Sequence, residues 1–155
     1  MKSPTKAIAH AEQQCIENGT KLTQKRKAVL LGLLKSNQAL SAYELSDLCK
    51  EELGEPLPPM SVYRILDFLE SEQLVHKLKL ANRFVACVHI TCDHQHAVPQ
   101  FLICTNCYRV SEISIKESTL RALQKNVADA GYKLVSPQIE MNCLCDECVA
   151  ETANA

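Results

Sequence analysis

The chain has 155 residues, 46% of them hydrophobic, which suits one ordinary folded domain or two small ones and argues against disorder. Its formal charge is −1, with 11 basic and 10 acidic residues through Leu80 and 6 and 8 after it, so a DNA-binding surface must be local. Nine cysteines without a secretory signal, and no apolar run of roughly twenty residues, argue against secreted and membrane-spanning proteins. We therefore expect a cytoplasmic protein.

Three helices are predicted in the first half of the chain. From 22 to 34, apolar residues recur at helical spacing after Thr23, which can cap the helix. Ser41 and Glu44 have the spacing of a capping box and predict the start of a second helix. After a run of prolines, we expect Ser61 to open a third helix. Its apolar stripe consists of Val62, Ile65, Leu66 and Leu69.

A hairpin is predicted directly after the third helix. Two short β-like runs, 74–80 and 83–89, flank the turn at 81–82. Three helices followed by a hairpin predict an N-terminal winged helix-turn-helix DNA-binding domain over residues 1–84, with a hinge at 85–91.

The second half, residues 92–155, is expected to form a small C-terminal α/β domain, which makes the whole chain an α+β protein. Gly131 is expected to end its helix. The predicted strands and helix are, in order, 100–103, 110–115, the helix 116–130, and 132–141.

Two C-x2-C pairs, Cys104 with Cys107 and Cys145 with Cys148, predict a structural zinc site. Four thiolates satisfy tetrahedral zinc, and the 37 intervening residues mean that the metal would close a strand-helix-strand unit. The alternatives are buried apolar cysteines or a dithiol redox couple, although a redox couple needs only one such pair. Cys143 places a fifth thiol beside the cluster, and we expect it to be spare.

A second set of soft ligands is spread from the predicted hairpin to the predicted strand 110–115. His76, Cys87, Glu112 and the loop histidines His94 and His96 combine imidazole, thiolate and carboxylate, a set that suits Zn²⁺ and not Mg²⁺ or Ca²⁺. A single cysteine favours zinc over iron(II). Each residue also has an ordinary interpretation: a wing residue, a core thiol or a solvated carboxylate.

The third helix carries candidate DNA contacts in its first turns. Tyr63 and Arg64 are expected to face outwards, where a recognition helix enters the major groove, and Arg64 can contact guanine or phosphate. Tyr43, Lys25 and Arg26 are candidate phosphate contacts. A solvated helix face is the alternative for all five residues.

These residues resemble the ferric uptake regulator family over nearly the whole chain. The resemblance rests on the two C-x2-C pairs and on Leu22-Thr23-x-x-Arg26, Ser41-Ala-Tyr43 and Ser61-Val-Tyr-Arg64. Within the family, the segments around Ser61–Leu69, Val75-His76-Lys and Phe84-Val85-x-Cys87 are most similar to the zinc uptake regulators. The resemblance implies a zinc-responsive DNA-binding repressor of zinc uptake genes, with zinc as corepressor.

The family also implies two Zn²⁺ ions per chain. The structural zinc would be held by Cys104, Cys107, Cys145 and Cys148, and the regulatory zinc by His76, Cys87, His96 and Glu112, with His94 as the alternative to His96. Tyr108 stands where relatives usually have glycine, and the histidine-rich tail of relatives is missing. His89, Cys92 and the unused loop histidine could form a further site, which no motif fixes.

The mechanism implied is a homodimer, joined through the C-terminal domain, that reads a pseudo-palindromic operator in double-stranded DNA. Zinc would fix the spacing of the two winged helices. One alternative is an iron- or peroxide-sensing regulator of the same family, against which Cys87 argues. Another is a metalloenzyme or thiol oxidoreductase, but no general-base motif supports an enzyme. A third is a zinc-stabilised interaction module that has lost DNA binding.

Overall fold

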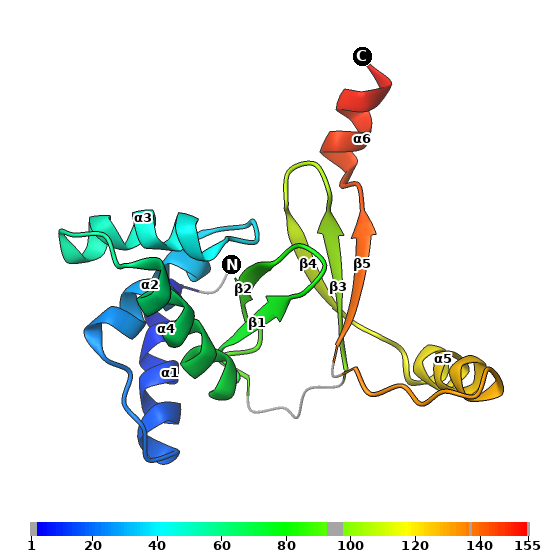
Figure 1. The fold of residues 1–155 in the computed structure, drawn as a ribbon, viewed down its shortest axis with the longest axis horizontal. Helices are drawn as coiled ribbons and strands as arrows, with labels where there is room; N and C mark the ends of the chain where they lie inside the picture. Colours follow the sequence, from blue (N-terminus) through cyan, green and yellow to red (C-terminus); the bar gives the residue numbers. More distant parts are fainter. Residues whose placement is uncertain (1–2, 93–97, 137, 155) are drawn as a thin grey trace. The chain divides into compact units, whose positions relative to one another are not determined.

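The computed structural model describes residues 3–92, 98–136 and 138–154, which belong to two compact units, Met1–His94 and Gln95–Ala155. The first unit contains helices α1 to α4 and strands β1 and β2, and the second contains β3 to β5 with helices α5 and α6 (Figure 1). Among the described residues, no helix combines the length and apolar character needed to cross a membrane.

Helix α1 (Pro4–Glu17) was not predicted. Its buried face consists of Ala7, Ala11 and Cys15, which recur every four residues and so lie on one side of the helix. Pro4 stands at the first helical position, where its missing N–H leaves no intrahelical bond unmade. These small side chains let α1 lie close to the core of the unit.

Helices α2 (Gln24–Lys35) and α3 (Ala42–Leu53) begin where the capping residues predict. The Thr23 side chain accepts from the backbone N–H of Arg26, and the capping box of Ser41 and Glu44 is formed in both directions. Helix α3 ends at Gly54, whose φ of 77° is the left-handed conformation that favours glycine. Both predictions are confirmed.

Helix α4 (Pro59–Ser71) begins two residues before the predicted Ser61. We expected the helix to begin only after the prolines. Pro59 instead occupies its first turn, where proline is tolerated. The predicted apolar stripe is confirmed in that Val62, Leu66 and Leu69 are fully buried.

A two-stranded antiparallel sheet of β1 (Val75–Leu78) and β2 (Arg83–Ala86) follows α4. Both strands are shorter than predicted, and Asn82 in the turn has a φ of 50°. Phe84 exchanges backbone hydrogen bonds with Leu40, at 2.8 and 3.0 Å, which attaches the hairpin to the segment before α3. Three helices with this hairpin form the predicted winged helix.

Glu72, directly after α4, links α1 to the end of that helix. It is only 7% exposed, and its carboxylate accepts from the side chains of Asn18 at 2.8 Å and Thr20 at 3.0 Å. Its backbone carbonyl accepts from Gln14 at 2.5 Å. A buried carboxylate therefore joins the end of α1 to the end of α4 through hydrogen bonds.

The second unit has a three-stranded sheet with β3 (Pro99–Cys104) between β4 (Val110–Ser114) and β5 (Ile139–Cys143) (Figure 1). Strand β3 runs antiparallel to β4 and parallel to β5. The predicted strand 132–141 is wrong in its first part, because 132–136 is irregular and β5 begins at Ile139. Residues 139–143 pair with β3, and none of the described residues between 132 and 138 lies in a strand.

Helix α5 (Glu117–Asp129) is confirmed, and Gly131 after it has a φ of 86°. None of its residues is buried. Helix α6 (Asp146–Ala153), which begins inside the second C-x2-C pair, was not predicted. The described residues of this unit that are buried are Phe101, Ile103, Cys104 and Cys148, so its own core is small.

Candidate metal centres and DNA-binding face

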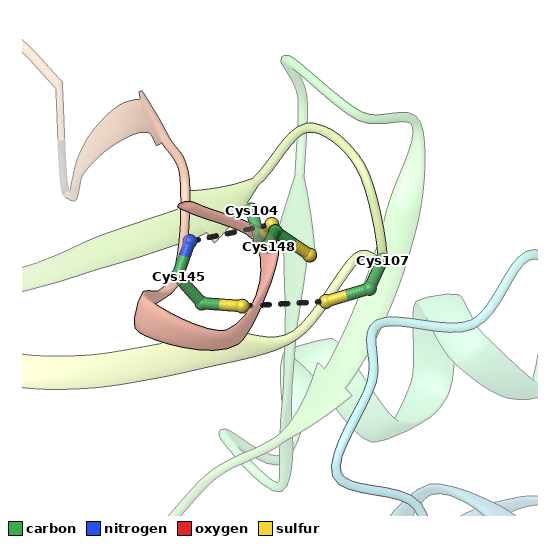
Figure 2. Close-up of side chains that lie close together, drawn as sticks. All are labelled: Cys104, Cys107, Cys145 and Cys148. Carbon is green, nitrogen blue, oxygen red and sulfur yellow. Dashed lines mark hydrogen bonds between the residues drawn. The ribbon is translucent and has the colours of Figure 1, made fainter. Parts of the chain in front are cut away.

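The four predicted zinc ligands of the second unit come together. Cys104 ends β3, Cys107 follows in the next turn, Cys145 caps α6, and Cys148 lies in its first turn (Figure 2). Their ligand atoms all lie within 4.8 Å of one another, and the Sγ atoms of Cys107 and Cys145 are 3.7 Å apart. Four sulfurs at 2.3 Å from a tetrahedral zinc would be about 3.8 Å apart. We refer to these four cysteines as the clamp.

The electrostatics of the clamp favour a bound cation. Backbone N–H groups of Cys107 and Cys145 lower the pKa of Cys104 to about 6. Cys148 accepts from the Asn106 amide at 3.3 Å, which lowers its pKa, but the Cys145 thiol, burial and the other clamp thiols raise that pKa to about 12. One thiolate therefore forms readily, whereas a full set of thiolates needs a positive charge among them.

The turn that carries the first cysteine pair is fixed by the backbone. The N–H of Tyr108 donates to the carbonyl of Cys104 at 3.0 Å, and the N–H of Cys104 donates to the carbonyl of Arg109 at 2.9 Å. Tyr108 has a φ of 59°, a left-handed conformation. Glycine is favoured in this conformation, and tyrosine adopts it here.

Cys143 is the last residue of β5 and pairs in register with Cys104. Its Sγ is 3.7 Å from the carbonyl of Met141, and it does not belong to the metal-binding group that the described residues form. The clamp therefore consists of Cys104, Cys107, Cys145 and Cys148, and Cys143 remains a nearby fifth thiol.

The predicted regulatory ligands divide between the two units. His76 lies on β1 and Cys87 directly after β2, and their ligand atoms lie within 4.8 Å of each other. Cys87 is only 3% exposed, and its N–H donates to the carbonyl of Leu74 at 2.9 Å, which fixes its position beside β1. Glu112 is a half-buried residue of β4 in the second unit. The loop histidines His94 and His96 lie outside the described residues.

The candidate DNA contacts on α3 and α4 differ in exposure. Arg64 is exposed in the second turn of α4, and Tyr43 is 65% exposed in the first turn of α3. Tyr63 was expected to face outwards but is half-buried and packs against the core of the first unit. Its ring therefore packs α4 against that core, and its predicted DNA contact stays a prediction.

The basic cluster at the start of α2 has roles within the fold. Lys25 is exposed. The Arg26 guanidinium donates to the carbonyl of Lys21 at 2.6 Å and lies over the ring of Phe68 at 3.5 Å from its centroid, and Lys27 pairs with Glu12. Arg26 thus fastens α2 to α4, and its predicted phosphate contact stays a prediction.

Two polar residues beside the clamp, Asn106 and Arg109, were not predicted from the sequence. Asn106 donates to Cys148, and the Arg109 guanidinium donates to Glu147 at 2.8 Å. Asn106 lies inside the first C-x2-C pair and Arg109 two residues after it, so the sequence alone shows that both are near one cysteine pair. It does not show that they contact Cys148 and Glu147, which belong to the second pair and its helix.

Comparisons with known proteins agree with this architecture. The ferric uptake regulator family model matches residues 17–142. The zinc uptake regulation protein of Escherichia coli (strain K12) is 35% identical over 142 residues, covering 92% of this chain and 81% of that protein. A zinc uptake regulator complexed with zinc and DNA is 31% identical with a TM-score of 0.82, covering 99% of each chain. The holo form of XcZur is 34% identical with a TM-score of 0.73, covering 96% of this chain and 99% of that one. The chain belongs to the ferric uptake regulator family.

Proposed function

We propose that this chain is a zinc-responsive DNA-binding transcriptional repressor of zinc uptake genes that acts in the cytoplasm with zinc as corepressor. One observation carries the proposal: the unit that forms the winged helix also holds a histidine and a cysteine whose ligand atoms lie within 4.8 Å of each other, His76 and Cys87. A metal bound there would be held by the hairpin that directly follows helix α4. The similar structure of a zinc uptake regulator with zinc and DNA supports the same function.

The clamp would hold a structural zinc ion. Its donor set of four thiols suits zinc, and the 3.7 Å separation of the Cys107 and Cys145 sulfurs fits the tetrahedral arrangement. When bound, the zinc neutralises part of the thiolate charge and joins the end of β3 to α6. Its role would be to fold the second unit.

The regulatory zinc would be the second ion of each chain. We assign it to His76, Cys87, Glu112 and the loop histidine His96, with His94 as the alternative. The buried thiol of Cys87 supports zinc over iron(II), because thiolate is a softer ligand than the carboxylate and imidazole that iron(II) regulators use. These ligands belong to both units, so zinc would restrict their relative movement.

A homodimer joined through the second unit would present two winged helices to DNA. Helix α5 has no buried residue although it carries Leu123, and Ile113 on β4 and Met141 on β5 are also exposed by 42% and 45%. A unit with so small a core and this much exposed apolar surface is suited to burial against a second copy.

Zinc would act by differential affinity for the form that binds DNA. Two winged helices about one helical turn apart can read both halves of a pseudo-palindrome. A shift of occupancy from about 1:99 to 99:1 requires roughly ten-thousand-fold tighter zinc binding to that form, or about 5.5 kcal/mol. Four ligands drawn from both units can supply such a difference.

The test measures binding of the full-length protein to a labelled DNA duplex, obtained by selection, while zinc, iron(II) or manganese(II) is added. Fluorescence anisotropy of the duplex is the readout. Cys87→Ser and His76→Ala should abolish zinc-dependent binding and leave a folded dimer, as judged by circular dichroism and sedimentation. Cys49→Ser and His10→Ala are matched controls, because both lie in the first unit outside the site.

Unchanged zinc-dependent binding by both variants would refute the regulatory assignment. DNA binding that responds to iron(II) and not to zinc would refute the zinc-responsive function and leave the family intact.

A further inference from the structure

An ion pair connects the two halves of the clamp. Arg109 follows the first cysteine pair, and Glu147 lies between the two cysteines of the second, in the first turn of α6. The Arg109 Nη2 donates to a carboxylate oxygen of Glu147 at 2.8 Å. The backbone carbonyl of Arg109 also accepts from the N–H of Cys104, so Cys104 holds the backbone of this residue and Glu147 holds its side chain.

The ion pair itself contributes little to stability. The side chains of Arg109 and Glu147 are 36% and 71% exposed, and exposed pairs typically contribute about 0–1 kcal/mol because water screens them. If Arg109 only joined two segments through this ion pair, its removal would therefore change the stability of the unit little.

Four thiolates around one Zn²⁺ leave a net negative charge, which a nearby cation stabilises. The pKa of Arg109 is raised first by its hydrogen bond to Glu147 and by that carboxylate's charge, and also by the charges of Cys145 and Cys107. Geometry places the positive charge there too: Glu147, its partner at 2.8 Å, lies between Cys145 and Cys148, and Arg109 itself lies two residues after Cys107. Among the clamp's described neighbours, Glu147 has the opposite effect, because it adds negative charge.

We propose that Arg109 is a positioning residue that retains zinc in the clamp by placing its positive charge beside the thiolates, with Glu147 orienting the guanidinium. The proposal rests on the structural zinc proposed above. It predicts opposite roles for the two members of the pair: Arg109 stabilises the loaded cluster, whereas Glu147 only restrains Arg109 and itself repels the cluster.

The experiment uses the full-length zinc-loaded dimer after mild chelation of its exchangeable zinc. Release of the remaining zinc to an excess of a chromogenic chelator is followed by absorbance. Arg109→Ala should accelerate release by about tenfold, the low end of the range for groups that support metal ligands, because the side chain is partly exposed. Glu147→Gln should leave the rate unchanged or slow it. Arg109→Lys, which keeps the charge, should restore most of the difference.

Two further measurements separate charge from general weakening of the unit. The ratio of the Arg109→Ala rate to the unmodified rate should fall as salt is raised, since salt screens the charge. The cobalt(II)-substituted variants should keep the thiolate-to-cobalt absorption of the unmodified protein. Arg121→Ala is the matched control, because Arg121 forms an exposed ion pair with Glu117 on α5.

An unchanged release rate for Arg109→Ala would overturn the proposal. Equal acceleration by Arg109→Ala and Glu147→Gln would also overturn it, because the pair would then act only as a mechanical link. The same applies if Arg121→Ala accelerates release as much as Arg109→Ala. An unmodified protein that holds no zinc in the clamp would instead refute the structural zinc, before any variant is compared.

Discussion

Removing zinc from the clamp should unfold the second unit and leave the first unit folded. The change is Cys107→Ser, which removes one of four ligands, or extraction of the metal by a strong chelator under reducing conditions. The two units differ in what holds them together: the first has a continuous core of buried residues from α1 to the hairpin, whereas the second buries four of its described residues, of which two are clamp cysteines.

The magnitudes decide the outcome. Burial of Phe101 and Ile103 contributes about 1.5–3 kcal/mol for each side chain. A structural zinc ion contributes about 10–16 kcal/mol of apparent binding free energy near neutral pH. The metal term is therefore larger than the contribution of the two large core side chains together. Without it, the sheet and α6 lack enough stabilisation to offset the conformational entropy of the chain.

Hydrogen exchange followed by mass spectrometry can resolve the two units in one experiment. In Cys107→Ser, peptides from β3 and β5 should exchange at the rate of an unfolded chain, while those from α2 and α4 stay protected. Cys143→Ser is the matched control, because its thiol lies beside the clamp but outside the four-cysteine group. Retained protection of β3 in the metal-free protein would refute the reasoning, and so would simultaneous loss of protection in α2.

Three further predictions concern parts of the chain away from the clamp. Glu72→Ala should lower the free energy of unfolding by about 1.5–3 kcal/mol and loosen the packing of α1, because it removes a buried charged acceptor of two hydrogen bonds. The measurement is hydrogen exchange, which should become faster in α1 alone. Burial raises the pKa of Glu44, but hydrogen bonds from Ser41 and the charge of Arg83 outweigh it and hold that pKa below its ordinary value. The contribution of Glu44 to the stability of the first unit is therefore present above pH 4.5 and is lost as the pH falls through the lower pKa of the folded state. Glu44→Gln should remove this pH dependence and flatten the acid side of the profile of stability against pH. An unchanged profile would contradict this. Leu123→Glu on α5 should convert dimers to monomers in sedimentation, and a dimer of unchanged affinity would show that α5 lies outside the interface.

The elements that could be predicted are those whose signals are local in sequence. The capping box of Ser41 and Glu44 identified the start of α3, because the residues that satisfy the first N–H groups of a helix lie within its first turn. The clamp was predictable for a similar reason: each cysteine pair lies within a single turn of chain. Helix α1 was missed because its buried stripe of Ala7, Ala11 and Cys15 consists of small residues.

The features that could not be predicted depend on partners distant in sequence. Tyr132 and Val135 belong to residue types that favour strands, yet they are 76% and 83% exposed, and no strand in the described part of the chain pairs with them. Tyr63 occupies a position that helical periodicity assigns to the outer face, but contacts with the core of the first unit half-bury its ring. The Arg109–Glu147 pair joins residues 38 positions apart, and no spacing rule connects them.

The small core of the second unit changes how variants must be interpreted. If zinc folds this unit and the unit forms the dimer, then loss of a clamp cysteine removes DNA binding indirectly, because two winged helices are no longer held together. Loss of His76 would remove DNA binding directly, with the dimer intact. The same loss of repression thus has two physical causes, and only a measurement of the folded, dimeric state separates them. A clamp variant that lost DNA binding as a fully folded dimer would mean that the clamp takes part in sensing.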